Sequence, residues 1–428
     1  MEKIRIGLLG FGVVGQGVWR LLEENNLEIV ENTDIQVEIR RILVRDRHKK
    51  RLLPPDSPLY TSQWKEILTD DEISIVVELM GGTEPALQYI KEALNAGKHV
   101  VTANKALLAQ HGSELTKQAK KNNVQLRYEA SVAGGIPVLQ AIRECLLANR
   151  IQSIMGIVNG TTNYILTNMT QAGSTFEEAL KGAQEHGYAE ADPTADVEGF
   201  DAAHKLTLLA SLGFKTSVDF QQVYREGINR IAPLDIEYGK ELGYVIKLLA
   251  IARDLNGKIE LRVHPTMIRK DHPLAAVNDA YNAVYIQGNA AGELMFYGKG
   301  AGALPTASAV MGDVINIARH FGHPNPPEYP LHYSPNGKKV QHMDETTTAY
   351  YIRLLVKDIP GVLGHIATTF GNNGVSLSSV IQKGETDPVS LVFVTHRTSE
   401  KAVQKAVEDI QSMNELMDVA AIIRVEDI

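Results

Sequence analysis

The first 130 residues alternate short apolar runs with segments of helical periodicity. The apolar runs that predict strands are 5–9, 36–44, 75–79, 99–102 and 124–128. Helices are predicted between them, and Val14, Val18 and Leu22 mark the apolar face of the first one. Because strands that alternate with helices favour a parallel sheet covered by helices, we predict an α/β domain over residues 1–130.

The pattern changes between residues 131 and 302. Segments with helical periodicity cover 137–147, 175–185, 201–212 and 234–249, whereas extended segments cover 151–158, 262–268, 283–287 and 293–297. This mixture predicts an α+β domain over residues 131–302. Residues 303–321 again have helical periodicity, and we expect this helix to return to the first domain.

The remaining chain divides into a linker and a final domain. Residues 322–347 contain five prolines and show no period, so we predict a linker. In residues 348–428, alternating apolar positions such as Val389, Leu391 and Phe393 indicate strands, and two amphipathic helices separate them. The order βαββαβ predicts a ferredoxin-like domain.

Composition and charge narrow the classes of function. Of the 428 residues, 44% are apolar and 22% are charged, and the net charge is −8. A negative charge spread along the chain argues against nucleic-acid binding and favours small-molecule partners. The single cysteine, Cys145, excludes an intrachain disulfide. Because no signal peptide opens the chain and no run approaches the roughly 18 apolar residues of a membrane helix, we expect a cytoplasmic protein with no membrane partner.

A glycine-rich motif follows the first predicted strand and opens a helix. It has the spacing GxGxxG and consists of Gly10, Phe11, Gly12, Val13, Val14 and Gly15. Gly10 permits a tight turn, Gly12 lets a pyrophosphate approach the backbone, and Gly15 lets the helix pack closely on the strand. The motif therefore predicts a Rossmann-type domain that binds a nicotinamide dinucleotide.

The end of the second predicted strand bears on the choice between NAD and NADP. A site for NAD places a carboxylate there to bind the ribose hydroxyls. Here Arg45 occupies that position, and a guanidinium suits a 2′-phosphate. We therefore expect NADP, with NAD possible because Asp46 follows directly. Residues 47–51 are interpreted as a solvated basic turn.

Two lysines are candidates for catalysis. Lys105 follows the predicted strand 99–102, at the edge where open α/β sheets bind ligands, or else is a surface residue at a helix start. Lys205 and Asp201 are four residues apart and share one face of a predicted helix, after an acidic run that contains Glu190 and Asp196. From the residues alone, this group is either a surface salt bridge or a site that binds an ammonium and transfers a proton.

Two further segments place polar groups after strands. Residues 159–164 read Asn-Gly-Thr-Thr-Asn-Tyr and predict a polar pocket wall or a helix cap. Glu129 and the turn carbonyls before Pro137 either bind a hard cation such as sodium or only cap and turn the chain. The chain has no Cys/His cluster and no HExxH motif, which argues against zinc catalysis.

With these motifs in order, the sequence resembles homoserine dehydrogenase, in the form that carries a C-terminal ACT domain. The resemblance covers essentially the whole chain. It rests on residues 10–15, 99–105, 129–137, 159–164, 187–205 and 298–302. It implies a reversible NAD(P)-dependent interconversion of L-homoserine and L-aspartate 4-semialdehyde in the biosynthesis of threonine, methionine and isoleucine.

The resemblance also implies roles for individual residues. Lys205 would exchange a proton with the substrate oxygen, and Lys105 would lie near nicotinamide and substrate. The carboxylates implied to bind the ammonium of homoserine are those of Glu190 and Asp201, with Asp196 nearby. The residues implied to reach the cofactor from outside the glycine motif are Arg45, Lys105, Gly187, Glu190 and Gly302. The implied sodium ligands are Glu129 and the carbonyls of Val132, Gly134 and Ile136.

Residues 348–428 resemble an ACT domain. The turn after its first strand, where ACT domains bind amino acids, contains Asp358, Gly361, Val362 and Leu363. The resemblance implies feedback control with L-threonine as the expected effector, across paired ACT domains of a homo-oligomer, either a dimer or a tetramer. The alternative is a domain that only holds the oligomer together.

Two other classes of function share parts of this pattern. An ACT-bearing dehydrogenase for 2-hydroxy acids is expected to use a histidine and an arginine for the substrate carboxylate, and the acidic run 190–201 argues against it. A non-enzymatic amino-acid sensor with a vestigial dinucleotide domain has no need of Lys105, Lys205 and Asp201.

Overall fold

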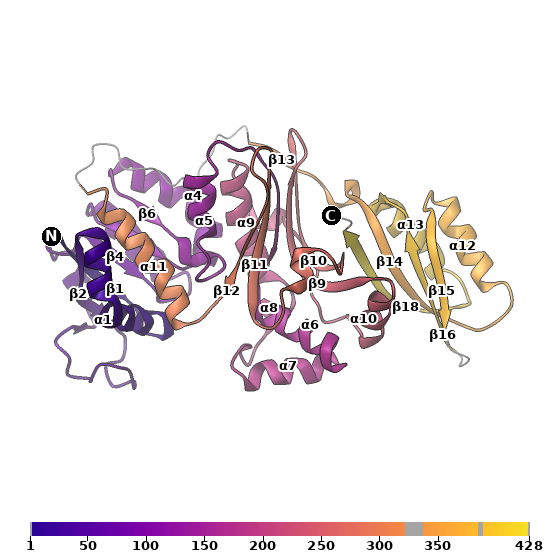
Figure 1. Cartoon of the computed structure of the whole chain (residues 1–428), viewed down its shortest axis with the longest axis horizontal. Coiled ribbons are helices and arrows are strands. Elements are labelled where there is room, and N and C mark those ends of the chain that lie inside the picture. Colours follow the sequence, from indigo (N-terminus) through magenta and orange to yellow (C-terminus); the bar gives the residue numbers. More distant parts are fainter. Residues whose placement is uncertain (1, 322–336, 384–387, 427–428) are drawn as a thin grey trace. The chain divides into compact units, whose positions relative to one another are not determined.

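The computed structural model describes residues 2–321, 337–383 and 388–426, which form two compact units. The first unit comprises Met1–Ile154, His204–Gln222 and Asn282–Lys338; the second comprises Met155–Ala203, Val223–Tyr281 and Lys339–Ile428. Figure 1 labels their helices and strands. Strand β7 (Ile151–Ile157) and helix α9 (Phe200–Gly213) contribute residues to both units.

The N-terminal part of the first unit is the predicted parallel sheet, with six strands in the order β3-β2-β1-β4-β5-β6. Its strands are β1 (Glu2–Leu9), β2 (Ile35–Leu43), β3 (Tyr60–Thr61), β4 (Ile75–Glu78), β5 (His99–Thr102) and β6 (Leu126–Arg127). The helices between them are α1 (Val13–Thr33), α2 (Trp64–Leu68), α3 (Ala86–Asn95) and α4 (Lys105–Lys121). The short β3 was not predicted because two residues carry no periodicity.

Helix α11 (Ala303–Ala318) packs on this sheet although it lies far away in the sequence. Its Val310 and Val314 belong to the same apolar core as Ile6 of β1 and Val18 of α1. A Cβ atom on Gly17 would lie only 2.3 Å from the carbonyl oxygen of Ala303, so glycine is required where α1 meets α11. In Figure 1, α11 runs in orange beside the indigo α1.

The rest of the first unit includes strands β11 (Tyr281–Gly288) and β12 (Gly292–Lys299), which confirm two predicted extended segments. The predicted helix 137–147 is only partly an α-helix. Helix α5 (Val138–Gln140) passes into a π-helix over Ala141–Cys145, since Leu146 donates its backbone N–H to Ala141, five residues earlier.

The second unit contains helices α6 (Gly160–Ala172), α7 (Phe176–Glu185), α8 (Thr194–Val197) and α10 (Pro233–Glu241). It also contains a long antiparallel hairpin of β9 (Tyr244–Asp254) and β10 (Lys258–Arg269). The short strand β8 (Tyr224–Arg225) pairs with β10 in parallel.

The prediction of one helix over 234–249 was wrong. Helix α10 ends at Glu241, Gly243 adopts a left-handed φ of 87°, and β9 starts at Tyr244. The residues from Ile246 to Ala252 are all buried in the strand. A continuous apolar run of this kind has no period that distinguishes a buried strand from a buried helix, and pairing with β10 decides it.

The C-terminal part of the second unit has the predicted βαββαβ order, with one additional two-residue strand, β17 (Thr398–Ser399), before the second helix. Its elements are β14 (Thr347–Val356), α12 (Val362–Asn372), β15 (Leu377–Lys383), β16 (Val389–Thr395), β17 (Thr398–Ser399), α13 (Glu400–Gln411) and β18 (Leu416–Glu426). Its sheet joins the hairpin through parallel pairing of β18 with β10, in the order β9-β10-β18-β14-β16-β15. This fold, together with the Rossmann-type sheet, confirms the predicted fold class.

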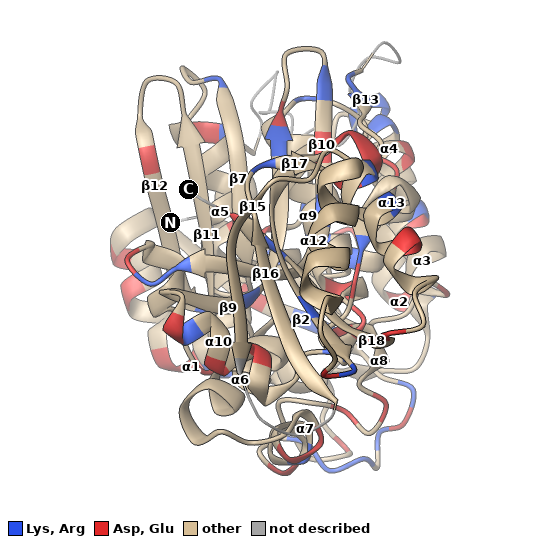
Figure 2. Ribbon diagram, turned by 90° about the vertical axis from the view of Figure 1, so that its right-hand side faces the viewer, with Lys and Arg blue, Asp and Glu red and all other residues tan. Residues whose placement is uncertain are grey.

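Most of the predicted linker, residues 322–336, lies outside the described residues. The described remainder contains strand β13 (Lys339–Val340), which pairs with β10. Lysines, arginines and carboxylates are interspersed over the elements in Figure 2. Among the described residues, every helix is too short or too polar to cross a membrane.

Candidate active site

The glycine motif forms a tight turn between β1 and α1. Gly10 has φ of 94°, and a Cβ atom there would lie 2.8 Å from the carbonyl oxygen of Leu79. A Cβ atom on Gly15 would lie 2.4 Å from the carbonyl oxygen of Gly10. By contrast, a Cβ atom on Gly12, the N-cap of α1, would have no heavy atom within 4 Å. The open backbone at this helix N-terminus suits the close approach of a pyrophosphate.

A cavity of about 440 Å³ opens beside the motif. Gly10, Phe11 and Gly12 line it on one side, and Arg45 lines it from the end of β2. Lys49 and Arg51 line it too, so the turn 47–51 is more than the solvated turn that was predicted. Arg51 fixes this turn because its Nε donates to the carbonyl of Phe11, at 3.2 Å.

Asp46, whose carboxylate made NAD a possible cofactor, forms hydrogen bonds within this turn. One of its carboxylate oxygens accepts the backbone N–H of His48 at 2.8 Å, and its carbonyl accepts from Arg51. The side chains of Arg45 and Asp46 are both exposed. Asp46 also lines the cavity, but the three basic residues Arg45, Lys49 and Arg51 outnumber it at this end, and such a basic excess suits a phosphate.

Lys105 is the first residue of α4, directly after β5, as the strand pattern predicted. Asn104 is the N-cap of this helix, and its side-chain amide donates to the carbonyl of Gly82 at 2.7 Å. Lys105 is partly buried, and its position after the end of β5 places it at the carboxyl edge of the sheet. This is the edge at which open α/β sheets bind their ligands.

Glu78, a buried carboxylate at the end of β4, was missed by the sequence analysis. It accepts hydrogen bonds from the Thr102 hydroxyl at 2.6 Å and from the backbone N–H of Met80 at 2.8 Å. Burial raises its pKa despite these hydrogen bonds. The sequence signal for Glu78 is an acidic residue at the end of an otherwise apolar strand. Burial of a carboxylate at such a position is costly unless the carboxylate is hydrogen-bonded.

In the second unit, Asn159 connects two of the predicted substrate carboxylates. Its Nδ2 donates to Asp196 at 2.6 Å and to Asp201 at 2.9 Å. Its Oδ1 accepts the backbone N–H of Thr162 at 2.8 Å and so caps α6. The segment 159–164 therefore provides the helix cap, one of the two roles predicted for it. Asn159 itself was not singled out because its role depends on residues about 40 positions later.

The acidic segment around these carboxylates is held by further contacts. The Thr161 hydroxyl lies 2.6 Å from the carbonyl of Tyr188 and 3.1 Å from the Asp196 carboxylate. Asp196 is half-buried, whereas Glu190 and Gly187 are exposed in the loop that follows α7. The structure therefore brings Asp196 of α8 and Asp201 of α9 together, with Glu190 exposed in the loop before α8.

Helix α9 carries both Asp201, in its first turn, and Lys205. The two side chains are only 8% and 9% exposed. Their i,i+4 spacing sets them on one helix face, and their burial excludes the alternative of a solvated surface salt bridge. Gly302, which was predicted to line the cofactor, is the exposed N-cap of α11 and has φ of 127°.

Glu129, the predicted cation ligand, is 3% exposed. Its two carboxylate oxygens accept backbone N–H groups of Leu139 at 2.8 Å and Gln140 at 2.7 Å. Burial, followed by repulsion from Asp313, raises its pKa to about 7. Val132, Gly134 and Ile136 follow in the turn, and Ile136 also accepts a backbone N–H of Val138. Within the described part of the chain, no cluster of three or more His, Cys, Asp or Glu side chains forms a metal site.

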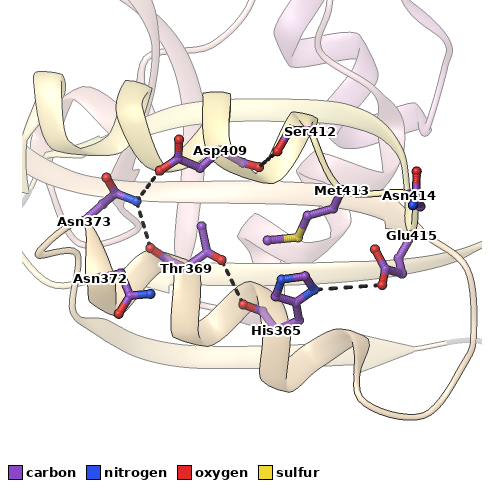
Figure 3. A pocket seen from close by; sticks show the side chains of 9 residues that line it. All are labelled: His365, Thr369, Asn372, Asn373, Asp409, Ser412, Met413, Asn414 and Glu415. Carbon is purple, nitrogen blue, oxygen red and sulfur yellow. Dashed lines mark hydrogen bonds and ion pairs between the residues drawn. The ribbon is translucent and has the colours of Figure 1, made fainter.

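Surface cavities occur at two places in the described part of the C-terminal domain. One, of about 340 Å³, is lined by the whole predicted effector turn, including Asp358, Gly361, Val362 and Leu363. The other, of about 390 Å³, lies between α12 and α13 and is shown in Figure 3. In this second cavity, Asn373 bonds Asp409 and His365 pairs with Glu415, so its polar groups are largely satisfied by one another.

Comparison with known proteins places the chain in a family. Residues 10–129 match the model of the homoserine dehydrogenase NAD-binding domain, residues 137–315 match the model of homoserine dehydrogenase, and residues 350–415 match the ACT domain. A homoserine dehydrogenase from Synechocystis is 46% identical over 99% of both chains. One from Neisseria gonorrhoeae is 43% identical over 100% of both.

Solved structures of homoserine dehydrogenases are similar to this chain as well. The crystal structure of a homoserine dehydrogenase from Thiobacillus denitrificans has a TM-score of 0.94 and 41% identity, over 100% of this chain and 99% of that chain. A hyperthermophilic archaeal homoserine dehydrogenase in complex with NADPH has a TM-score of 0.65 and 29% identity, over 76% of this chain and 100% of that one.

The Rossmann-type domain with its glycine turn, joined to a catalytic domain and an ACT domain, defines an NAD(P)-dependent oxidoreductase that acts on a CH–OH group. Its substrate is a small molecule. The chain belongs to the homoserine dehydrogenase family.

Proposed function

We propose that this enzyme interconverts L-homoserine and L-aspartate 4-semialdehyde, with Lys205 as the group that exchanges a proton with the substrate oxygen. The observation that carries this proposal is the pair of carboxylates, Asp196 and Asp201, that Asn159 holds together, with Asp201 one helical turn before Lys205. Two adjacent negative charges suit the ammonium of homoserine. A lysine on the same helix then faces the other end of a short substrate.

The chemistry divides between the cofactor and the protein. A bound nicotinamide dinucleotide accepts or supplies the hydride. Lys205 donates a proton to the substrate oxygen when the aldehyde is reduced, and accepts it when the alcohol is oxidised. Asp196, Asp201 and Glu190 orient the substrate through its ammonium, and Lys105 assists beside the nicotinamide. Gly187, Glu190 and Gly302 contribute to the cofactor site.

The direct experiment follows nicotinamide absorbance with L-homoserine and either cofactor. We expect substrate-dependent reduction of NADP, and slower reduction of NAD. Absence of turnover with both cofactors, in a protein that binds dinucleotide, would overturn the proposed substrate. The preference for NADP is supported by the three basic residues that line the cofactor cavity, Arg45, Lys49 and Arg51.

We further propose that Glu129 and the carbonyls of Val132, Gly134 and Ile136 hold a monovalent cation such as sodium. A buried carboxylate whose pKa is raised to about 7 fits this role, because a cation stabilises its ionised form. Sodium is then expected to raise the unfolding temperature above that in choline chloride of equal ionic strength. The same difference in the Glu129→Ala variant would contradict the assignment.

We infer that the ACT domain binds an amino-acid effector, with L-threonine as the expected one. The support is the cavity lined by Asp358, Gly361, Val362 and Leu363. An enzyme with this substrate and effector belongs to threonine, methionine and isoleucine biosynthesis in the cytoplasm, where feedback by an end product is useful.

We also propose a homo-oligomer, dimer or tetramer. Strand β12 supports it because Met295 is 36% and Tyr297 is 54% exposed there, and sedimentation velocity tests it.

We propose functional domains over 1–130 with the return helix 303–321, over 131–302 and over 348–428, joined by the linker 322–347. A cooperative unfolding transition of an isolated 348–428 fragment tests this division.

A further inference from the structure

Arg424, in the last strand of the ACT domain, is a charged residue with only 1% of its side chain exposed. Inside the domain it binds Glu400 at the start of α13 through two hydrogen bonds, of 2.8 and 2.6 Å. Tyr350 of β14 donates its hydroxyl to the same carboxylate at 2.8 Å. The guanidinium is therefore anchored firmly in the ACT domain.

The same guanidinium also reaches the substrate domain. Its Nη1 donates to Glu226 at 2.9 Å and its Nη2 donates to the hydroxyl of Tyr224 at 2.9 Å. Tyr224 in turn donates its hydroxyl to Glu226. Tyr224 lies in β8, and Glu226 follows this strand directly. β8 and β18 pair with successive parts of the same edge of β10, and Arg424 is opposite Thr266, because β9 occupies the other edge.

The segment after Tyr224 packs against the segment that carries Asp196 and Asp201. The guanidinium of Arg225 stacks 3.6 Å above the ring of Phe200, the residue directly before Asp201. The backbone N–H of Ile228 donates to the carbonyl of Val197, at 2.9 Å. A Cβ atom on Gly227 would lie 2.5 Å from that carbonyl, so the two segments are in close contact.

We propose that Arg424 is a positioning residue, which holds the substrate-binding segment Asp196–Asp201 through Tyr224 and Glu226 and transmits the state of the ACT domain to it. This inference rests on the proposed substrate role of Asp196 and Asp201. A ligand that shifts α13 or β18 moves Arg424, and the change passes along β8 to both ends of the segment. Coupling of this kind is reciprocal, so homoserine and the ACT ligand affect each other's binding.

Replacing Arg424 itself is a poor test, because it leaves the buried Glu400 carboxylate without its partner and unfolds the domain. Tyr224→Phe removes one hydroxyl of the relay and leaves the Arg424–Glu400 pair intact. Tyr351→Phe is the matched control. Tyr351 lies next to Tyr350 in β14. Its hydroxyl donates at 3.0 Å to Asp235 on α10 and not to Tyr224 or Glu226.

Two measurements separate positioning from general destabilisation. In hydrogen exchange, Tyr224→Phe is expected to speed exchange of the amides of residues 197–203, and Tyr351→Phe is not. In steady-state kinetics, Tyr224→Phe is expected to raise KM for L-homoserine about 2- to 10-fold, the effect of one lost hydrogen bond, with KM for the dinucleotide unchanged. The ratio of homoserine KM with and without L-threonine is expected to fall toward one.

Equal exchange in the two variants would overturn the inference, even if both remain active. Faster exchange at 197–203 with an unchanged KM for homoserine would support the positioning role of Arg424 and would instead refute substrate binding by Asp196 and Asp201. The two proposals are therefore tested separately.

Discussion

The side-chain amide of Asn159 donates a 2.9 Å hydrogen bond to the carboxylate of Asp201, in the first turn of the helix that carries Lys205. This bond joins a strand end to a helix start 42 residues later. Because the same amide also binds Asp196, one residue fixes the distance between two negative charges. The geometry of the proposed ammonium site thus depends on an uncharged residue.

Loss of this amide is expected to impair substrate binding more than folding. Asn159→Ala should raise KM for L-homoserine at least about 10-fold and destabilise the protein by about 1–3 kcal/mol, because it leaves buried Asp201 and half-buried Asp196 with one donor fewer each and removes the cap of α6. Steady-state kinetics and thermal unfolding measure the two effects. Thr175→Ala, which removes the cap of α7, is the control for loss of a cap alone. An equal rise of KM in both variants would contradict the assignment.

Lys205 is expected to be required for turnover and dispensable for dinucleotide binding. Lys205→Ala should lower kcat about 100- to 10,000-fold, the usual contribution of a proton-transferring side chain, with an unchanged Kd for NADPH. Stopped-flow absorbance and fluorescence titration measure these quantities. Lys181→Ala, at an exposed position of α7, should behave as the wild type. Near-normal turnover of Lys205→Ala would remove this residue from the catalytic role.

Arg45 is expected to determine the preference for NADP. Arg45→Ala should weaken NADP relative to NAD by about 10- to 100-fold, which corresponds to the loss of one charge-assisted hydrogen bond to the 2′-phosphate. The measured quantity is the ratio of kcat/KM for the two cofactors. Arg47 lies in the same turn but outside the described lining of the cavity, so Arg47→Ala should leave the ratio unchanged. An unaltered ratio in Arg45→Ala would show that the phosphate is bound elsewhere.

The pH dependence of stability should contain a contribution from His99. Burial, followed by repulsion from Arg127, lowers its pKa to about 4, and its Nδ1 accepts the backbone N–H of Gln125 at 3.0 Å. Since the unfolded chain takes up a proton near pH 6.5 and the folded chain does not, the contribution of His99 is present above pH 6.5 and is lost as the pH falls toward 4.

Unfolding experiments between pH 7.5 and 4.5 test this effect. His99→Gln should reduce the loss of unfolding free energy over this range, by no more than about 3 kcal/mol. His48→Gln, at an exposed histidine, should follow the wild-type curve. Identical pH profiles for His99→Gln and the wild type would contradict the neutral, partly buried state of His99.

Asp358 is expected to bind the ammonium of the effector. Asp358→Ala should raise the L-threonine concentration for half-inhibition about 10-fold or more without changing kcat in its absence, because the catalytic residues are untouched. Asp418→Ala, an exposed carboxylate on β18 of the same domain, is the control. Equal inhibition of all three proteins would exclude Asp358 as a ligand.

The sequence by itself determined the elements whose signal is local. The GxGxxG turn, the alternation of strands and helices, and the βαββαβ order all follow from spacing along the chain, and the structure confirms them. The i,i+4 relation of Asp201 and Lys205 is equally local. Such features need no knowledge of partners, because backbone periodicity alone sets which side chains share a face.

Only the tertiary structure decided the features that depend on distant partners. Residues 244–249 form a strand because β10 pairs with them, although their apolar run fits a helix equally well. Asn159 and Glu78 matter through groups far away in the sequence, and Arg424 connects a C-terminal strand with β8. Burial of polar and charged groups is tolerated only where partners satisfy them, and the sequence does not specify which partners the fold brings within hydrogen-bond distance.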